Sequence, residues 1–241
     1  MMADISPIIL SVKVALLSTV IVSATGTLAA WIMHRYRFPG QHLVETIIGL
    51  PLVLPPTVIG FGLLLLFGKN GPLGSFLENS FQFRVVFTWW AAVISAAVVS
   101  LPLMYRSARA GLETVDKSLE RAARTLGATE WRVFFTVTLP LAKSGVVAGI
   151  MLAFTRALGE FGATLMLAGN IPGQTQTIPL AIFFAAESGD MRTAGYLVTI
   201  ISLVSFIITY GLNTWSGGKQ PVLRTQRGGS YAGNSCQKSL T

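Results

Sequence analysis

Charged side chains are scarce in this sequence of 241 residues, and acidic ones are the scarcest. Only 12% of the residues are charged, about half of the roughly 25% that is typical of soluble proteins. The hydrophobic share is 52% and the mean hydropathy is +0.62. Cys236 is the single cysteine, which excludes disulfide frameworks and multi-cysteine metal sites within one chain. The composition therefore favours a membrane protein over a soluble one.

The excess of basic residues gives a formal net charge of +8, a value that also occurs in nucleic-acid-binding proteins. In those proteins the bases cover a polar face, whereas here they lie in gaps between apolar runs. A transmembrane helix needs about 20 mostly apolar residues. We therefore expect an all-α transmembrane bundle with five main spans, in contact with membrane lipids and without a nucleic-acid partner. The expected spans cover about residues 8–33, 43–67, 85–106, 143–168 and 194–214.

Two segments affect the number of spans. A signal peptide has a basic start and an apolar core of about 7–15 residues, whereas the first run follows Asp4 and is longer, so a retained helix is favoured. Residues 180–186 are apolar but too short to cross a membrane. They predict a short helix or a re-entrant piece at the membrane surface, which makes six spans possible.

The basic residues also orient the chain, because cytoplasmic loops are enriched in Lys and Arg. Thirteen of the 18 bases lie in three regions that a five-span chain places on one side, against three bases in the opposite loops. This predicts an outside N-terminus and a cytoplasmic C-terminus. A transmembrane domain is expected over 8–215. The tail over 216–241 is rich in Gly, Ser, Gln and bases and is expected to be flexible.

No catalytic, cofactor or metal site can be recognised in the sequence. His34 and His42 lack Cys or carboxylate partners at metal-ligand spacing, so a solvated interfacial position is favoured for both. The phosphate-loop pattern G-x-x-x-x-G-K-[ST] is also absent. The chain is therefore expected to have no ATPase site of its own, and any transport it drives would take its energy from a partner or a gradient.

The segment 107–142 is the longest polar stretch between spans. An apolar residue recurs at steps of three and four, which predicts one stripe of a helix. Gly127 follows the last of these residues, where a left-handed glycine can end a helix. The pattern alone fits equally an amphipathic helix on the membrane surface and a docking helix for a cytoplasmic partner. The stripe consists of Leu112, Val115, Leu119, Ala122 and Leu126.

The residues of this segment resemble the signature loop of ABC-importer permeases. The family pattern is an acidic residue, two alanines, three residues, a glycine, and then nine residues to an aliphatic-x-Leu-Pro. Arg121 occupies the acidic position, and Glu120 lies one residue earlier, about 100° around a helix. The resemblance implies coupling helices that seat in a groove of an ATP-binding subunit. The implied coupling residues are Glu120, Arg121, Ala122, Ala123, Gly127, Val137, Leu139 and Pro140.

Three further stretches, 50–60, 159–164 and 169–179, are similar to the molybdate permease subunits of that family. This implies a homodimer in a bacterial inner membrane, a pair of ATP-binding subunits that hold ATP and Mg²⁺, and an external molybdate-binding protein. The resemblance covers about residues 8–214. A sulfate or tungstate importer permease remains an alternative, as does the different class of a channel or secondary transporter.

Several residues within the predicted spans suggest a translocation pathway or gate. Proline removes a backbone donor and bends a helix, so a proline pair in the second span indicates either a gating bend or a kinked packing helix. Arg156 and Glu160 are four residues apart in the fourth span, where they form either a site for a passing anion or a structural ion pair. The candidate residues are Pro55, Pro56, Arg156, Gly159, Glu160, Gly162 and Thr164.

Overall fold

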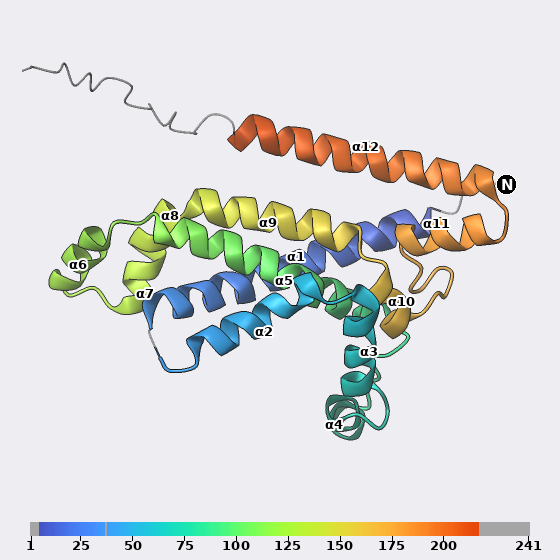
Figure 1. Ribbon diagram of the computed structural model, residues 1–241, viewed down its shortest axis with the longest axis horizontal. Coiled ribbons are helices and arrows are strands. Elements are labelled where there is room, and N and C mark those ends of the chain that lie inside the picture. The colour runs from blue at the N-terminus through green and yellow to red at the C-terminus, as the bar shows by residue number, and fades with distance from the viewer. Residues whose placement is uncertain (1–4, 37, 217–241) are drawn as a thin grey trace, which may run out of the picture.

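A computed structural model describes residues 5–36 and 38–216, and the regular secondary structure of this part of the chain is entirely helical (Figure 1). The expected all-α fold is thereby confirmed. Of the predicted tail, 216–241, only residue 216 lies within the described residues. In chain order the elements are α1 (Ser6–Arg35), α2 (Gln41–Val53), α3 (Pro56–Phe67), α4 (Pro72–Phe81), α5 (Trp89–Glu113), α6 (Lys117–Thr125), α7 (Glu130–Val133), the π-helix η1 (Phe134–Thr138), α8 (Leu139–Leu141), α9 (Lys143–Leu158), α10 (Gly162–Ala168), α11 (Ile178–Glu187) and α12 (Met191–Ser216).

Three of these helices, α1, α5 and α12, are long and apolar enough to cross a membrane. The number rises to five if each of two sharply bent pairs, α2 with α3 and the run from α7 to α8 with α9, crosses as one span. The five predicted spans equal this upper number. Two of them, the second and the fourth, consist of separate helices, whereas one helix was expected for each, with a bend or kink at the proline pair of the second.

The centre of the bundle is formed by α1, α5 and α9, which pack along much of their lengths (Figure 1). Small residues make this packing close, as in many membrane helix contacts. A Cβ atom on Gly145 of α9 would lie 2.5 Å from the Cα of Gly111 in α5, so the two backbones touch. Beside this contact the hydroxyl of Ser107 donates to the carbonyl of Gly145 at 2.8 Å.

The second predicted span, 43–67, is two helices rather than one. The chain bends by 118° between α2 and α3, which is far more than a kink within one helix. The residue before a proline is disfavoured in the helical region, and here two prolines follow each other. Leu54 and Pro55 are accordingly extended, with ψ of 142° and 138°, and the new helix begins at Pro56. α3 then leaves the bundle and forms, with α4, the arm seen in Figure 1.

The fourth predicted span, 143–168, is also interrupted. α9 ends at Leu158, and α10 begins only at Gly162, so the expectation of one continuous helix is wrong. α10 packs instead against α3. A Cβ on Gly60 of α3 would lie 2.8 Å from the Cα of Ala163 in α10, so these two short helices approach backbone to backbone.

The apolar stretch 180–186 lies within the ten-residue helix α11, so the prediction of a short helix there is confirmed. Gly189, with φ of +82°, forms the turn that reverses the chain into α12. In Figure 1, α12 runs along the outside of the bundle beside α9. Most of its side chains are exposed, as expected for a helix that faces lipid or another protein.

The contact between Gly111 and Gly145 generates a stability prediction. Gly145→Val should lower the free energy of unfolding by about 1–3 kcal/mol, because its side chain meets backbone that has no room to shift. The measurement is thermal unfolding of the purified protein in detergent. Gly195→Ala is the control, since a Cβ there meets open space and should leave stability equal or slightly higher. Equal melting of the two variants would contradict the close contact.

Candidate functional site

The helix α6 is held at both ends by its own sequence. At its start the carboxylate of Asp116 accepts a hydrogen bond from the backbone N–H of Ser118 at 2.8 Å, and this bond lowers the pKa of Asp116. At its end Gly127 has φ of +82°, and the N–H of Ala128 donates to the carbonyl of Ala123 at 3.2 Å. The N–H of Gly127 donates to the carbonyl of Arg124 at 2.9 Å, and these two C-terminal bonds form a Schellman motif, so the prediction that Gly127 ends this helix is confirmed.

The predicted apolar stripe is wrong, because its members do not share one helix. α5 extends to Glu113, and a turn at 114–116 changes the phase before α6 begins. Leu112 and Val115 are buried, whereas Leu119 and Leu126 are 48% and 88% exposed. The side of α6 that faces the protein is instead polar.

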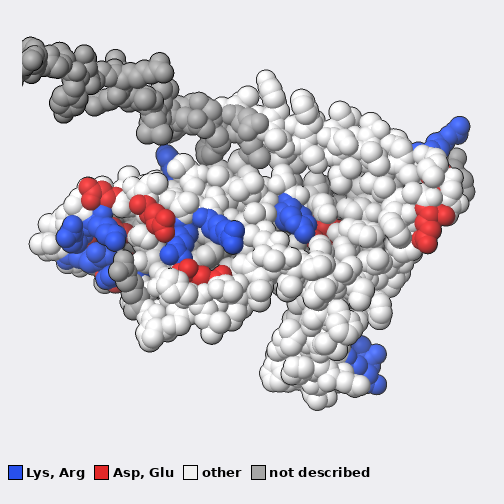
Figure 2. Space-filling view, viewed as in Figure 1, with Lys and Arg blue, Asp and Glu red and all other residues white. Residues whose placement is uncertain are grey.

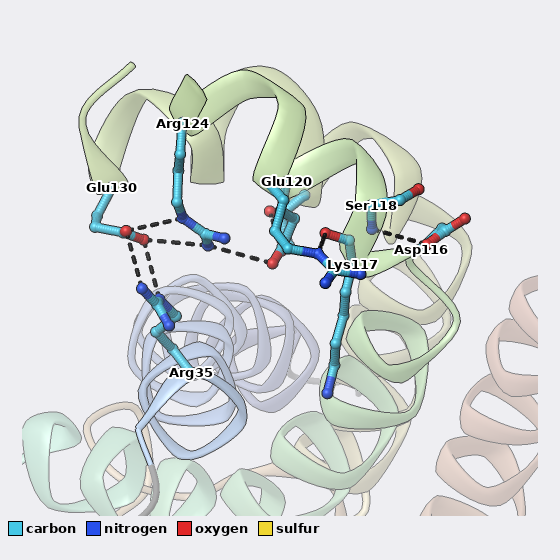
Figure 3. A network of polar contacts seen from close by, with 9 residues as sticks. Arg35, Asp116, Lys117, Ser118, Glu120, Arg124 and Glu130 are labelled. Carbon is cyan, nitrogen blue, oxygen red and sulfur yellow. Dashed lines mark hydrogen bonds and ion pairs between the residues drawn. The ribbon is translucent and has the colours of Figure 1, made fainter. Parts of the chain in front are cut away.

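Glu120 is the centre of this polar side, and only 8% of it is exposed. One carboxylate oxygen accepts a hydrogen bond from the hydroxyl of Thr138 at 2.7 Å, and the other pairs with Arg124 at 3.3 Å (Figure 3). Glu120 therefore ties α6 to η1 within the chain. The next residue, Arg121, is exposed, and its Nε donates to the carbonyl of Lys117 at 3.3 Å.

Glu130 forms a second tie, between this segment and α1. Its carboxylate accepts two hydrogen bonds from Arg35, at 3.0 and 3.1 Å, and is also bonded by Arg124 at 2.9 and 3.3 Å (Figure 3). The bond from Arg35 is the main reason that the pKa of Glu130 lies below its ordinary value of 4.5. Two arginines from distant parts of the chain thus share one carboxylate.

Aromatic rings fix the rest of the segment to the end of α1. The ring of Trp31 lies 5.0 Å from that of Trp131 and 4.9 Å from that of Phe134, centroid to centroid. The chain then passes through η1 into α8 and turns by 78° at Ala142 into α9. The predicted Leu139 and Pro140 lie in α8, and Val137 lies in η1.

The outer side of α6 and its surroundings is a small apolar surface. Ala122 is exposed and Ala123 is half-buried, and the exposed Leu119 and Leu126 lie on the same face of the helix. We call these four residues the outer α6 surface. Its small residues permit close approach, and the bonds of Glu120 and Glu130 hold it in place from beneath.

The second candidate region is the break between α9 and α10. The guanidinium of Arg156 pairs with the carboxylate of Glu160 at 2.7 Å, so the predicted contact between these residues is confirmed. Glu160 does not lie on the same helix, however. It is 3% exposed, and its other oxygen accepts a hydrogen bond from the N–H of Ala163 at 2.9 Å. The carboxylate therefore caps the start of α10, where negative charge is favoured.

The other predicted pathway residues differ in their contacts near this break and in their exposure. A Cβ on Gly162 would lie 3.0 Å from the Cβ of Pro56, which brings the proline break of the second span against the break of the fourth. Thr164 is buried within α10 at 1% exposure, so its hydroxyl does not face an open surface. Gly159 ends α9. Arg156 retains 30% exposure of its side chain.

One face of the molecule carries further charges that sequence reasoning did not single out. Figure 2 shows basic side chains on this face from the α6 end to the middle of the molecule, over α5 and α9. Arg106 of α5 is exposed, and its guanidinium lies 3.4 Å from where a Cβ of Gly49 would be. Arg109 pairs with Glu45 and, at 3.0 Å, with Glu113. The packing of α2 on α5 brings Glu45 and Gly49 next to these arginines, whereas Arg109 and Glu113 are four residues apart on α5 itself.

Long apolar helices and two broken spans define a polytopic membrane protein, in which the capped helix α6 presents an exposed apolar surface at one end. The comparisons are consistent with this class. The chain belongs to the family of binding-protein-dependent transport system inner membrane components, whose model matches residues 23–219. This confirms the family membership that the signature segment predicted.

Among its relatives, the molybdenum transport system permease protein ModB of Escherichia coli (strain K12) is 44% identical over 86% of this chain and 91% of its own length. ModB of Haemophilus influenzae is 46% identical over 87% and 93%. The sulfate transport system permease protein CysT of Escherichia coli (strain K12) is 38% identical over 86% and 76%.

Solved structures share the fold at low sequence identity. A chain of a bacterial ABC transporter involved in the import of the acidic polysaccharide alginate matches with a TM-score of 0.70 and 19% identity, over 90% of this chain and 80% of that chain. A chain of the inward-facing MetNI methionine ABC transporter matches with a TM-score of 0.65 and 14% identity, over 90% and 95%.

The buried bonds of Glu120 generate a prediction on local stability. Glu120→Ala leaves the hydroxyl of Thr138 and the guanidinium of Arg124 without this partner, at a cost of about 1–3 kcal/mol. Backbone amides of α6 should therefore exchange hydrogen faster in the isolated protein, measured by mass spectrometry. Glu187→Ala, at an exposed glutamate, should leave α6 unchanged. Unaltered exchange in the Glu120 variant would show that α6 does not depend on this carboxylate.

The bonds of Glu130 generate a prediction on pH. Its pKa is lowered in the folded state, so the bonds stabilise the protein fully above the ordinary value of 4.5 and are lost as the pH falls through the lowered pKa. The difference in unfolding midpoint between the natural protein and Glu130→Gln should therefore be constant from pH 7 to about pH 5 and shrink below it. A difference that grows on acidification would contradict the assignment.

Proposed function

We propose that this chain is the membrane-spanning subunit of an ATP-driven importer that moves molybdate into the cytoplasm. The single observation that carries the proposal is the identity of 44–46% to molybdenum transport permeases along most of both chains. The capped helix α6, with its outer surface and signature residues, supports the coupling to ATP. The 38% identity to a sulfate permease makes sulfate the second candidate cargo, and tungstate, another tetrahedral oxyanion, the third.

In this proposal the outer α6 surface seats in a groove of an ATP-binding subunit. Glu120 takes no part in docking because it is buried against Thr138. It instead keeps α6 and η1 together, so that a displacement of α6 reaches α9 through α8. ATP and Mg²⁺ are held by the ATP-binding pair, and this chain contributes no ATPase site or cofactor of its own.

The proposed assembly contains two copies of this chain and an external molybdate-binding protein. It lies in the inner membrane of a bacterium, with the N-terminus outside and the C-terminus and α6 in the cytoplasm. The bias of the basic residues supports this orientation. The exposed apolar side chains of α1, α3 and α12 support contact with lipid and with the second copy.

The proposed pathway for the anion follows the charged face over α5 and α9. A charge in a membrane span costs about 2.5–3.5 kcal/mol on insertion scales, so an arginine there needs a partner or a role. Arg156 has both, since it pairs with Glu160 and keeps part of its side chain exposed. Arg106 has no carboxylate partner among the described residues, and it lies nearer to α6 than Arg156 because Gly111 of α5 packs against Gly145 at the start of α9. We assign it the next contact of the anion.

The test of the pathway uses proteoliposomes with the ATP-binding subunit and the molybdate-binding protein. The double variant Arg156→Gln, Glu160→Gln removes both charges and keeps an acceptor for the N–H of Ala163. Uptake of molybdate should fall about 10–100-fold, the value of a hydrogen bond to a charged group, while assembly is unchanged. Arg192→Gln, at an exposed base, is the control. Full uptake by the double variant would leave the pair a structural role only.

The same vesicles test the function itself. ATP-dependent uptake of molybdate should exceed that of sulfate when the molybdate-binding protein is supplied. Uptake without the ATP-binding subunit would reject an importer and favour a channel or secondary transporter.

A further inference from the structure

A polar pocket of about 260 Å³ lies between the end of α1 and the inner side of α6. Figure 3 shows that the side chains of Lys117, Glu120 and Arg124 extend from α6 on the side of Arg35. A water molecule takes about 30 Å³ in the liquid, so the pocket has room for a phosphate group with part of its hydration shell. It is lined by His34, Arg35, Lys117, Glu120, Arg121 and Arg124.

The charges around this pocket do not balance. Arg35 and Arg124 are compensated by Glu120 and Glu130, to which they are bonded. Lys117 and Arg121 have no carboxylate partner in the part of the chain that the structure describes, and Arg121 bonds only to a backbone carbonyl. Two positive charges are thus left over in a recess, where low-dielectric walls concentrate their field. Such a recess favours an anion.

The position of the pocket along α1 indicates which kind of anion can reach it. The uncharged run of α1 extends from Val14 to Met33, and 20 helical residues span about 30 Å, the thickness of the hydrocarbon layer. His34 and Arg35 follow at once, so the pocket lies at the depth of lipid headgroups. Basic pockets beside transmembrane helices on the cytoplasmic side bind anionic headgroups.

We propose that this pocket binds the phosphate of an anionic lipid, with Lys117 and Arg121 as its charged contacts. The lipid would join α1 to α6 as a third tie, next to the bonds of Glu130. The phosphate is the shared chemistry of a lipid headgroup and of free phosphate, and the position at headgroup depth assigns it to the lipid. The inference rests on the proposed function in one respect, namely that α6 lies on the cytoplasmic side of the membrane.

The test measures lipid retention rather than transport, so its failure is distinct from failure of the importer assignment. The full transporter complex is reconstituted in nanodiscs of phosphatidylcholine and phosphatidylglycerol, released into mild detergent, and examined by native mass spectrometry. The natural protein should retain phosphatidylglycerol, and Lys117→Gln should reduce the retained amount about fivefold, the effect of one basic residue at an anionic surface.

Two variants control this measurement. Arg132→Gln removes the same charge from an exposed position of the same segment outside the pocket and should leave retention unchanged. Lys117→Arg should restore it, which separates loss of charge from misfolding. The proposal would be overturned if Arg132→Gln and Lys117→Gln lost equal amounts of phosphatidylglycerol, or if Lys117→Gln retained as much as the natural protein.

A second arm distinguishes the two sources of phosphate. Excess inorganic phosphate is added to the released complex before the measurement. Retained phosphatidylglycerol should persist, because the acyl chains hold the headgroup in the membrane zone next to α1. Displacement by inorganic phosphate would overturn the lipid assignment in favour of a soluble anion.

Discussion

The buried carboxylate of Glu120 is the contact on which the position of α6 depends. A buried carboxylate is costly unless it is paired and hydrogen-bonded, and Glu120 has both an arginine and a hydroxyl partner. With Glu130, it turns the inner side of α6 into an ion-pair network and leaves the outer side for apolar residues. Rigid support beneath and a smooth surface above are what a helix needs if it is to transmit force from another protein.

Much of the fold could be predicted from sequence because a helix that crosses the hydrocarbon layer must contain about 20 mostly apolar residues. α1, α5 and α12 follow that rule, and Gly127 ends α6 because its φ is one that other residues rarely adopt. The pair of Arg156 and Glu160 was also predictable from spacing. The family membership followed from the register of a few small residues with Leu139 and Pro140.

The remainder depended on contacts that one-dimensional patterns do not contain. The proline pair at Pro55 predicts a bend, but its size of 118° depends on packing of α3 against α10. The stripe that ends at Leu126 failed because a three-residue turn shifts the helical phase and because a buried acid replaces an apolar residue. The shared carboxylate of Glu130 joins residues 95 positions apart, and nothing near Arg35 in the sequence indicates it.

The backbone contact of Gly111 with Gly145 has a mechanical consequence. Side chains that interlock resist rotation of one helix on another, but two glycines present smooth surfaces to each other. The contact lies at the start of α9, immediately after the corner at Ala142. It is therefore suited to act as a pivot on which α9, with Arg156 near its far end, can turn against α5.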